Sequence, residues 1–239
     1  MRVDVYNYSN KLNDHRISNS TVVVVDVLRA TTSIIWAIKN GAEKVVPAQD
    51  PGEAAAMAIK LGSRECVLAG ERGGVKMPGF HLGNTPMDFT GDIVSDKTVI
   101  ISTTNGTEAI CGVRSAKNVL IGAMINRTAV AKSAVEFGND IIIMCAGTEG
   151  QLSADDVCAA GAIVEAVSRV SEGGAKANDL ALIACLVYSD WVNGNADLSD
   201  TMHYSRLVRL GFEKDVEFCF KADVTDVVPV FKNGIITNS

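Results

Sequence analysis

Six short runs of apolar, mostly β-branched residues recur along the first two thirds of the chain, and a polar or glycine-rich turn follows most of them. The runs are TVVVV (21–25), KVVPA (44–48), CVLA (66–69), TVIIS (98–102), VLIGA (119–123) and IIIMC (141–145). Apolarity that is continuous rather than alternating is typical of strands covered on both faces. Between the runs lie helical stretches, several of which end on a glycine. The pattern predicts an α/β fold of three layers, with helices on both faces of a mainly parallel sheet.

The last third of the chain changes character. Long apolar periodicities predict three C-terminal helices over residues 153–170, 178–192 and 200–211. Near the end, Asn233-Gly234 between two apolar runs predicts a terminal hairpin, and Pro229 predicts an edge position for its first strand. No repeat or linker interrupts the chain. Residues 1–239 are therefore expected to form a single domain, in which the C-terminal helices cover the sheet.

Composition narrows the choice of partners. A net charge of −6 without any Lys/Arg run disfavours nucleic acid as a partner. No apolar run approaches the ~20 residues of a membrane span, so no membrane partner and a cytoplasmic location are expected. The six cysteines form no C-x-x-C pair, and we expect at least five of them to be buried, reduced thiols. Nothing in the composition decides whether the chain forms a homo-oligomer.

Chemically active side chains follow four of the predicted strands. They lie at Asp26 and Arg29, at Glu71-Arg72-Gly73-Gly74, at Thr103–Thr107 and at Ser153–Asp156. Ligands of open α/β sheets bind at the carboxyl ends of the strands. The sequence therefore predicts an active site where these four strand ends converge.

The loop Thr103-Thr104-Asn105-Gly106-Thr107 joins a buried strand to a predicted helix. A glycine-containing hydroxyl loop at a helix start presents free backbone N–H groups to an anion, and a phosphate accepts such hydrogen bonds. Alternatively, Thr104 or Asn105 caps the helix and Gly106 permits the turn with a positive φ angle. The neighbouring strand ends favour anion binding by all five residues.

Three carboxylates from three segments would make an oxygen-only site that suits Mg²⁺. Asp26, Glu71 and Asp156 are the candidate metal ligands, and Asp26 and Glu71 the candidate catalytic residues. Three alternatives stay open: Asp26 as a helix cap or a nucleophile, Asp156 in a capping box with Ser153, and Asp155 as the ligand instead of Asp156.

Two arginines and one amide are candidates for binding the substrate. Arg29 and Arg72 offer planar guanidinium groups that can hold an anion with two parallel hydrogen bonds. Asn84, in the stretch GFHLGNTP, can add a neutral hydrogen bond. The predicted substrate is therefore a small molecule that carries a second anion near its phosphate.

The segments VVVVDVLRATTSI, LAGERGGVKMPGFHLGNTP, ISTTNGTEAI and CAGTEGQLSADDVCAAG resemble, in order, the motifs of the 2-phosphosulfolactate phosphatase family. The resemblance covers roughly residues 20–165. It implies a Mg²⁺-dependent phosphatase linked to coenzyme M biosynthesis, which converts 2-phospho-3-sulfolactate to 3-sulfolactate and phosphate. It places Asp26, Glu71 and an acid of Ser153–Asp156 in metal-site motifs, and Thr103–Thr107 in the phosphate-site motif.

Two other functions remain as alternatives. The stretch VVVVDVLR superficially resembles the opening strand of isochorismatase-like cysteine hydrolases, which would use Asp26, a lysine and Cys145 without a metal. The second alternative is a non-catalytic module that binds a phosphorylated metabolite through the same loops.

Overall fold

The computed structural model describes residues 1–8, 12, 14–62, 65–171 and 174–238. Within them, one eleven-stranded sheet has the order β5-β4-β6-β3-β11-β10-β7-β2-β8-β1-β9. The strands are β1 (Arg2–Asn7), β2 (Thr21–Val25), β3 (Lys44–Pro47), β4 (Cys66–Arg72), β5 (Val75–Lys76), β6 (Thr98–Ser102), β7 (Asn118–Gly122), β8 (Ile141–Cys145), β9 (Lys176–Ala177), β10 (Pro229–Lys232) and β11 (Ile235–Asn238).

The helices of the described residues lie between and after these strands. They are α1 (Asp14–Ser18), α2 (Ala30–Lys39), α3 (Pro51–Leu61), α4 (Gly91–Val94), α5 (Gly106–Gly112), α6 (Arg127–Glu136), α7 (Ala154–Val170), α8 (Asp179–Val192), α9 (Met202–Arg209) and α10 (Glu213–Cys219), with short 3₁₀ turns η1 (Pro86–Asp88) and η2 (Met124–Asn126). The predicted α/β class, with helices on both faces of the sheet, is confirmed.

The alternating side chains of β2 show how the two faces are covered. Val23 and Val25 pack with residues of α6, α7 and α8 in one apolar cluster. Val22 and Val24 pack with residues of α1, α2 and α5 in a second cluster on the other face. Because both faces are buried, β2 needs apolar residues at every position, which is why its sequence shows no alternation.

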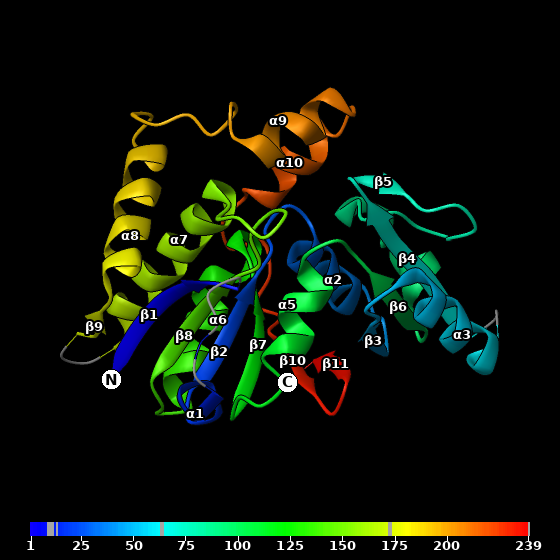
Figure 1. The fold of residues 1–239 in the computed structure, drawn as a ribbon, viewed down its shortest axis with the longest axis horizontal. Coiled ribbons are helices and arrows are strands. Elements are labelled where there is room, and N and C mark those ends of the chain that lie inside the picture. The colour runs from blue at the N-terminus through cyan, green and yellow to red at the C-terminus, as the bar shows by residue number, and fades with distance from the viewer. Residues whose placement is uncertain (9–11, 13, 63–64, 172–173, 239) are drawn as a thin grey trace.

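The sheet consists of two parallel groups joined by an antiparallel hairpin. Strands β4, β6 and β3 are parallel to one another, as are β7, β2, β8, β1 and β9. Between the groups, β11 is antiparallel to β3 and β10 is antiparallel to β7. Figure 1 shows the group containing β2 on the left, the group containing β4 on the right, and the hairpin below and between them.

This arrangement reverses the formal direction of one group relative to the other, so the strands do not share one simple carboxyl edge. A twist of about 20–25° per strand, over the six steps from β4 to β2, turns the chain direction by roughly 120–150°. The twist brings the carboxyl ends of the two groups back together. The backbone N–H of Glu149, after β8, donates to Asn105, after β6, and Gly106 lies against Asp26, after β2.

The predicted edge position of Pro229 is wrong, because β10 lies in the interior of the sheet. Pro229 is the first residue of the strand and pairs with Asn238 of β11. Strand β10 pairs with β7 through Val230–Leu120 and Phe231–Val119. The missing N–H of Pro229 therefore falls outside the hydrogen bonds between β10 and β7. The predicted hairpin at Asn233-Gly234 is confirmed.

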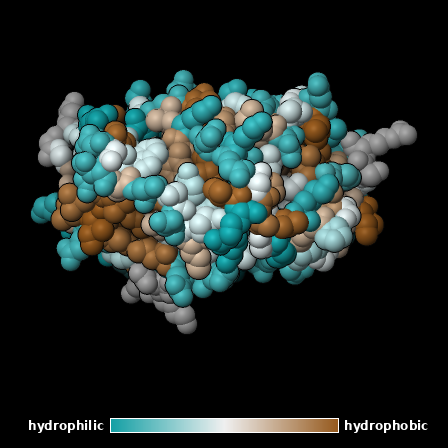
Figure 2. Space-filling view, turned by 90° about the horizontal axis from the view of Figure 1, so that it is seen from above, coloured by the Kyte–Doolittle hydropathy of each residue, from teal (hydrophilic) through white to brown (hydrophobic). Residues whose placement is uncertain are grey.

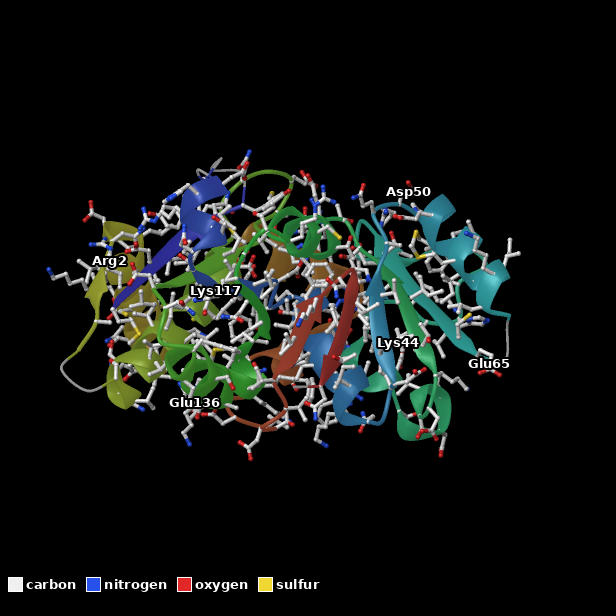
Figure 3. The ribbon with its side chains drawn as sticks, turned by 90° about the horizontal axis from the view of Figure 1, so that it is seen from below. Arg2, Lys44, Asp50, Glu65, Lys117 and Glu136 are labelled. Carbon is white, nitrogen blue, oxygen red and sulfur yellow. The ribbon has the colours of Figure 1, made fainter. Side chains whose placement is uncertain are left out.

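The apolar pattern does not predict strand β1, because a buried charge interrupts it. Asp4 is buried in the strand and forms ion pairs with Arg2 and Arg16. Seen from below in Figure 3, charged side chains also mark the amino ends of other strands, with Lys44 in β3, Glu65 before β4 and Lys117 before β7.

Helix α8 leaves an apolar stripe on the surface. Leu182, Ile183, Leu186 and Val192 are each more than half exposed. Hydrophobic residues gather on the left of the molecule in Figure 2, the side on which α8 lies in Figure 1.

No helix of the described residues is both long and apolar enough to cross a membrane.

The hairpin should contribute strongly to stability, and two adjacent isoleucines test this. Ile236 of β11 is fully buried, whereas its neighbour Ile235 is 38% exposed. We expect Ile236→Ala to lower the free energy of unfolding by about 2–5 kcal/mol, and Ile235→Ala by less than about 1 kcal/mol. Urea unfolding of both variants measures the difference. Equal losses would mean that the hairpin does not hold the two groups together.

Candidate active site

Asp26 follows β2 directly and is buried, with 7% of its surface exposed. Its Oδ1 accepts a hydrogen bond from the backbone N–H of Ala30 at the start of α2 (3.2 Å), while the side chain lines a small cavity. Burial raises the pKa of Asp26 to about 6, and the negative charge of Glu71 adds to this, although His203 and Arg29 oppose it. Asp26 is therefore a carboxylate whose ionisation is unfavourable, as is common at functional sites.

Glu71, near the end of β4, fixes the two loops beside it. Its Oε2 accepts the backbone N–H of Gly74 (2.6 Å), and its Oε1 accepts the N–H (2.8 Å) and hydroxyl (3.0 Å) of Thr104. Both oxygens are thus engaged by neighbouring protein groups. Glu71 lines the same cavity as Asp26, as the sequence predicts.

Asp156 ties together the loops after two neighbouring strands. Its Oδ1 accepts the N–H of Val27, after β2, and its Oδ2 the N–H of Gly147, after β8, both at 2.9 Å. The Ser153 side chain makes no cap hydrogen bond, so the capping-box alternative is wrong. Burial, followed by the charge of Asp26, raises the pKa of Asp156 well above its usual range.

The structure does not assemble the three predicted metal ligands into one cluster. Across the described residues, no group of three or more His, Cys, Asp or Glu side chains is placed to hold a metal ion. Glu71 and Asp156 are turned toward backbone N–H groups, and Asp156 is not among the residues that line the cavity. Asp155, the other candidate, is bonded to Ser153 and Thr201.

The hydroxyl loop is partly a cap and partly a link between loops. Thr103 Oγ1 accepts the N–H of Thr107 (3.2 Å), and the Thr107 hydroxyl donates to the Thr103 carbonyl (3.1 Å), so these two residues close the turn themselves. Asn105 does not cap the helix; its Oδ1 accepts the N–H of Glu149 (3.3 Å). Thr104 and Asn105 line the cavity.

Gly106 is required for a different reason from the predicted one. Its φ angle is not positive. Instead, a Cβ atom at this position would lie 2.5 Å from Cβ of Ala30 and 2.7 Å from Oδ2 of Asp26. The absence of a side chain therefore lets α5 approach the start of α2 and the carboxylate of Asp26.

Arg29 lies behind the cavity, and its predicted role as an anion ligand is not supported by its geometry. The guanidinium is 2% exposed and donates to Asp215 (2.5 Å) and to the Gly74 carbonyl (2.7 Å). It also lies over the ring of Phe212, 4.2 Å from its centroid. Arg29 thus attaches the C-terminal segment around α10 to the loops after β2 and β4.

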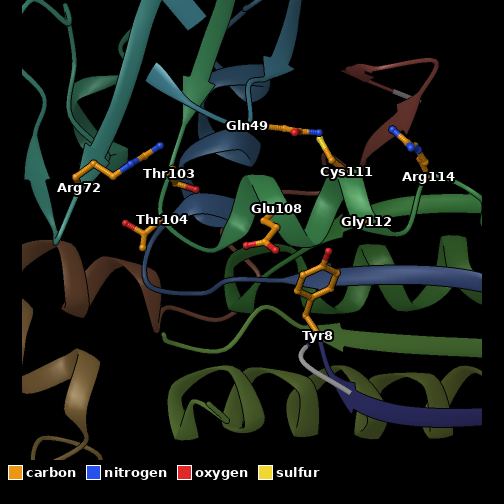
Figure 4. Close-up of a pocket in the computed structure, with 9 residues that line it drawn as sticks. All are labelled: Tyr8, Gln49, Arg72, Thr103, Thr104, Glu108, Cys111, Gly112 and Arg114. Carbon is orange, nitrogen blue, oxygen red and sulfur yellow. The ribbon is translucent and has the colours of Figure 1, made fainter. Parts of the chain in front are cut away.

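Arg72 faces a larger groove beside the cavity. Its guanidinium donates to the Glu71 carbonyl (2.7 Å) and to the Ser102 hydroxyl (3.1 Å), which leaves further N–H groups available for a ligand. The groove has a volume of about 500 Å³. Figure 4 shows its lining, in which Arg72 and Thr104 lie at one end and Tyr8, Gln49 and Arg114 lie along α5.

The cavity is also lined by two residues that the sequence does not mark as part of the site. His203 and Arg206 of α9 line it together with Asp26, Glu71 and Asn84. His203 donates from Nε2 to the Leu28 carbonyl oxygen (2.5 Å), since a carbonyl can only accept. Asn84 Oδ1 is buried and has no hydrogen-bond partner among the described residues. This unpartnered oxygen indicates a position for a bound cation or donor group.

Cys145 does not have the character of a nucleophile. Burial, and to a lesser extent Asp156, raise the pKa of its thiol well above the usual value. A reactive cysteine needs a lowered pKa, because the thiolate is the nucleophile. The cysteine-hydrolase alternative therefore loses its central residue. All six cysteines are free, as predicted, but four rather than at least five are buried, because Cys111 and Cys185 are only partly covered.

The fold and site define an α/β protein with a buried carboxylate in a cavity where two parallel groups of strands converge. Residues 6–234 match the family model described as 2-phosphosulpholactate phosphatase, and the chain belongs to this family. It is 39% identical to a Clostridium novyi protein named "Probable 2-phosphosulfolactate phosphatase", over 99% of this chain and 100% of the relative. A protein of the same name from Caldanaerobacter subterraneus is 38% identical, over 100% of this chain and 99% of the relative.

The raised pKa of Asp26 predicts that its charge destabilises the fold. The native state binds the proton more tightly than the unfolded chain, whose aspartates titrate near pH 3.9, so stability should be lost as pH rises from about 4 to about 6. Asp26→Asn removes the charge and can keep the hydrogen bond from Ala30. In metal-free buffer at pH 7.5, we expect this variant to be more stable by on the order of 2 kcal/mol.

Urea unfolding between pH 4 and pH 8 tests the sign of this effect. The advantage of Asp26→Asn should shrink toward pH 4, where the wild-type carboxyl is protonated. A variant that is less stable than wild type at neutral pH would show that the ionised carboxylate holds the start of α2.

Gly106→Ala tests the close approach of α5 to Asp26. The added methyl should force the helices apart and lower the free energy of unfolding by about 1–3 kcal/mol. A second change, Ala30→Gly, removes one of the two contacted atoms and should restore part of the loss, as thermal unfolding can measure. Gly91→Ala is the control, because the nearest atom to its Cβ would be 3.6 Å away. No rescue by Ala30→Gly would contradict the steric explanation.

Proposed function

We propose that the chain is a Mg²⁺-dependent phosphatase that hydrolyses the phosphomonoester of a small anionic 2-hydroxy acid. Family membership supports this reaction, and the names of the relatives point to 2-phospho-3-sulfolactate as substrate. The products would be 3-sulfolactate and inorganic phosphate, and the reaction would belong to coenzyme M biosynthesis.

One observation carries the proposal: the buried Asp26 carboxylate and the unpartnered Asn84 amide oxygen line the same cavity. Two oxygen atoms that lack strong donors, one of them on a carboxylate, suit a hard cation better than a neutral ligand. Their exclusion from bulk water would strengthen any electrostatic interaction with a charged phosphoryl group.

Mg²⁺ fits this donor set better than it fits the predicted carboxylate triad. Magnesium sites usually take one or two carboxylates and complete their coordination with waters and substrate phosphate. Asp26 and Asn84 would hold the ion, while Glu71 would act indirectly by fixing Thr104. When bound, the ion would neutralise charge on the phosphate oxygens and orient the attacking group.

The protein's own groups would bind and orient the rest of the substrate. The larger groove adjoins the cavity at Thr104 and offers the guanidinium of Arg72. A carboxylate or sulfonate beside the phosphate would reach this end of the groove and accept its hydrogen bonds. The hydroxyl loop lies between the two spaces, so it would contact the phosphoryl group, as the sequence predicts.

A phosphate-release assay with phosphorylated 2-hydroxy acids tests the proposal. Metal-stripped protein in excess EDTA should be inactive and should recover with Mg²⁺. Asp26→Asn should lower kcat/KM by about 10²–10⁴-fold, the range for removal of a catalytic group. Glu136→Gln is the control and should behave as wild type. Glu136 lies at the exposed end of α6, toward the lower edge of the molecule in Figure 3.

Full activity in EDTA would refute the requirement for a metal. Near-normal turnover by Asp26→Asn would remove this residue from the site. If no phosphomonoester is hydrolysed although phosphate binds, the chain is a non-catalytic binder.

A further inference from the structure

Two charged residues that the proposed function does not use meet at the cavity. Arg206 of α9 and Glu149, in the turn after β8, both line it, and Arg206 Nη2 lies 2.6 Å from Glu149 Oε1. The backbone N–H of Glu149 donates to Asn105 of the hydroxyl loop. The ion pair therefore joins α9 to two of the loops around Asp26.

The enclosed space is too small for a phosphoryl group. Its volume is about 20 Å³, roughly what one water molecule requires. A phosphoryl group has a central phosphorus and three terminal oxygens, so it cannot enter while Arg206 and Glu149 hold their present positions. Both side chains are partly exposed, at 30% and 55%, and can move without disturbing the core.

The charges around the cavity indicate which residue would meet the phosphate. Among the described residues that line it, Asp26, Glu71 and Glu149 are acidic, and Arg206 is the one permanently charged cation. Guanidinium groups bind phosphate oxygens with paired, charge-assisted hydrogen bonds. In the present structure the carboxylate of Glu149 takes the place of such an anion on Arg206.

Resting on the proposed function, we propose that Arg206 binds the phosphoryl group of the substrate and that Glu149 is an internal competitor for Arg206. The ion pair keeps the cavity closed in the absence of ligand. A phosphomonoester displaces Glu149 from Arg206, and the movement of the two side chains makes room for it. Arg206 is then a substrate-binding residue, and Glu149 lowers the affinity for every phosphate-containing ligand.

Inorganic phosphate is the probe, and isothermal titration calorimetry on the full chain with Mg²⁺ measures its dissociation constant without turnover. Glu149→Gln should bind phosphate about two- to fivefold more tightly, the range expected from releasing a partly exposed ion pair. Arg206→Gln should bind it about tenfold more weakly or worse, since a charged hydrogen-bond donor is lost. Arg206→Lys keeps the charge without the planar fork and should lie between Arg206→Gln and wild type.

Arg209→Gln is the matched control, because this exposed arginine lies on the same helix but does not line the cavity. It should leave phosphate affinity unchanged. The double variant with both Glu149→Gln and Arg206→Gln should bind no more tightly than Arg206→Gln alone, because Glu149 acts only through Arg206. Unchanged affinity in Arg206→Gln, or weaker binding by Glu149→Gln, would overturn the proposal.

The outcome separates this inference from the proposed function. The expected changes in phosphate affinity, without hydrolysis of any substrate, would support Arg206 and Glu149 in these roles and refute the phosphatase activity. Normal hydrolysis with unchanged phosphate affinity in Arg206→Gln would support the phosphatase activity and refute these roles of Arg206 and Glu149.

Discussion

The site depends on buried carboxylates that accept backbone N–H groups from loops far apart in the sequence. Asp156 joins the loops after β2 and β8, and Glu71 joins the turn after β4 to the loop after β6. In each case the two carboxyl oxygens of one side chain accept backbone N–H groups from two different loops, so a single buried residue holds both loops in place. Asp156 acts within one strand group and Glu71 within the other, so each fixes the loops on its own side of the cavity. The hydrogen bonds from Arg29 to the Gly74 carbonyl and from the Glu149 N–H to Asn105 then join the two sides.

The same arrangement places negative charges close together. The charge of Asp26 raises the pKa of Asp156 and that of Glu71 raises the pKa of Asp26, and neither aspartate forms an ion pair in the described structure. A fold selected for stability alone would place neutral groups here. Excess negative charge around a cavity is understandable if a cation occupies it during function, since the cation offsets the repulsion. The repulsion among these carboxylates and the proposed binding of a cation then have one physical origin.

How far the sequence predicts the molecule depends on the range of the interactions. Continuous apolar runs identify the six main strands, and residue type identifies Asp26 and Glu71, because these signals are local. The contribution of α9 could not be predicted, since nothing near His203 or Arg206 in the sequence marks a strand end or a loop motif. These residues reach the site through tertiary contacts, of His203 with the Leu28 carbonyl and of Arg206 with Glu149. The sequence marks Gly106 as a turn residue, whereas the contacts that require a glycine there come from Ala30 and Asp26 of another segment.

The position of the hairpin in the sheet has a consequence for synthesis of the chain. Strands β10 and β11 are made after both strands that they connect, so β3 and β7 each lack one partner until the hairpin has been synthesised. Unpaired strand edges are sites of aggregation, and pairing over such long sequence separations is slow. A nascent chain of this protein is therefore expected to need protection from aggregation until the hairpin has been made, because only then can the two groups of strands join into one sheet.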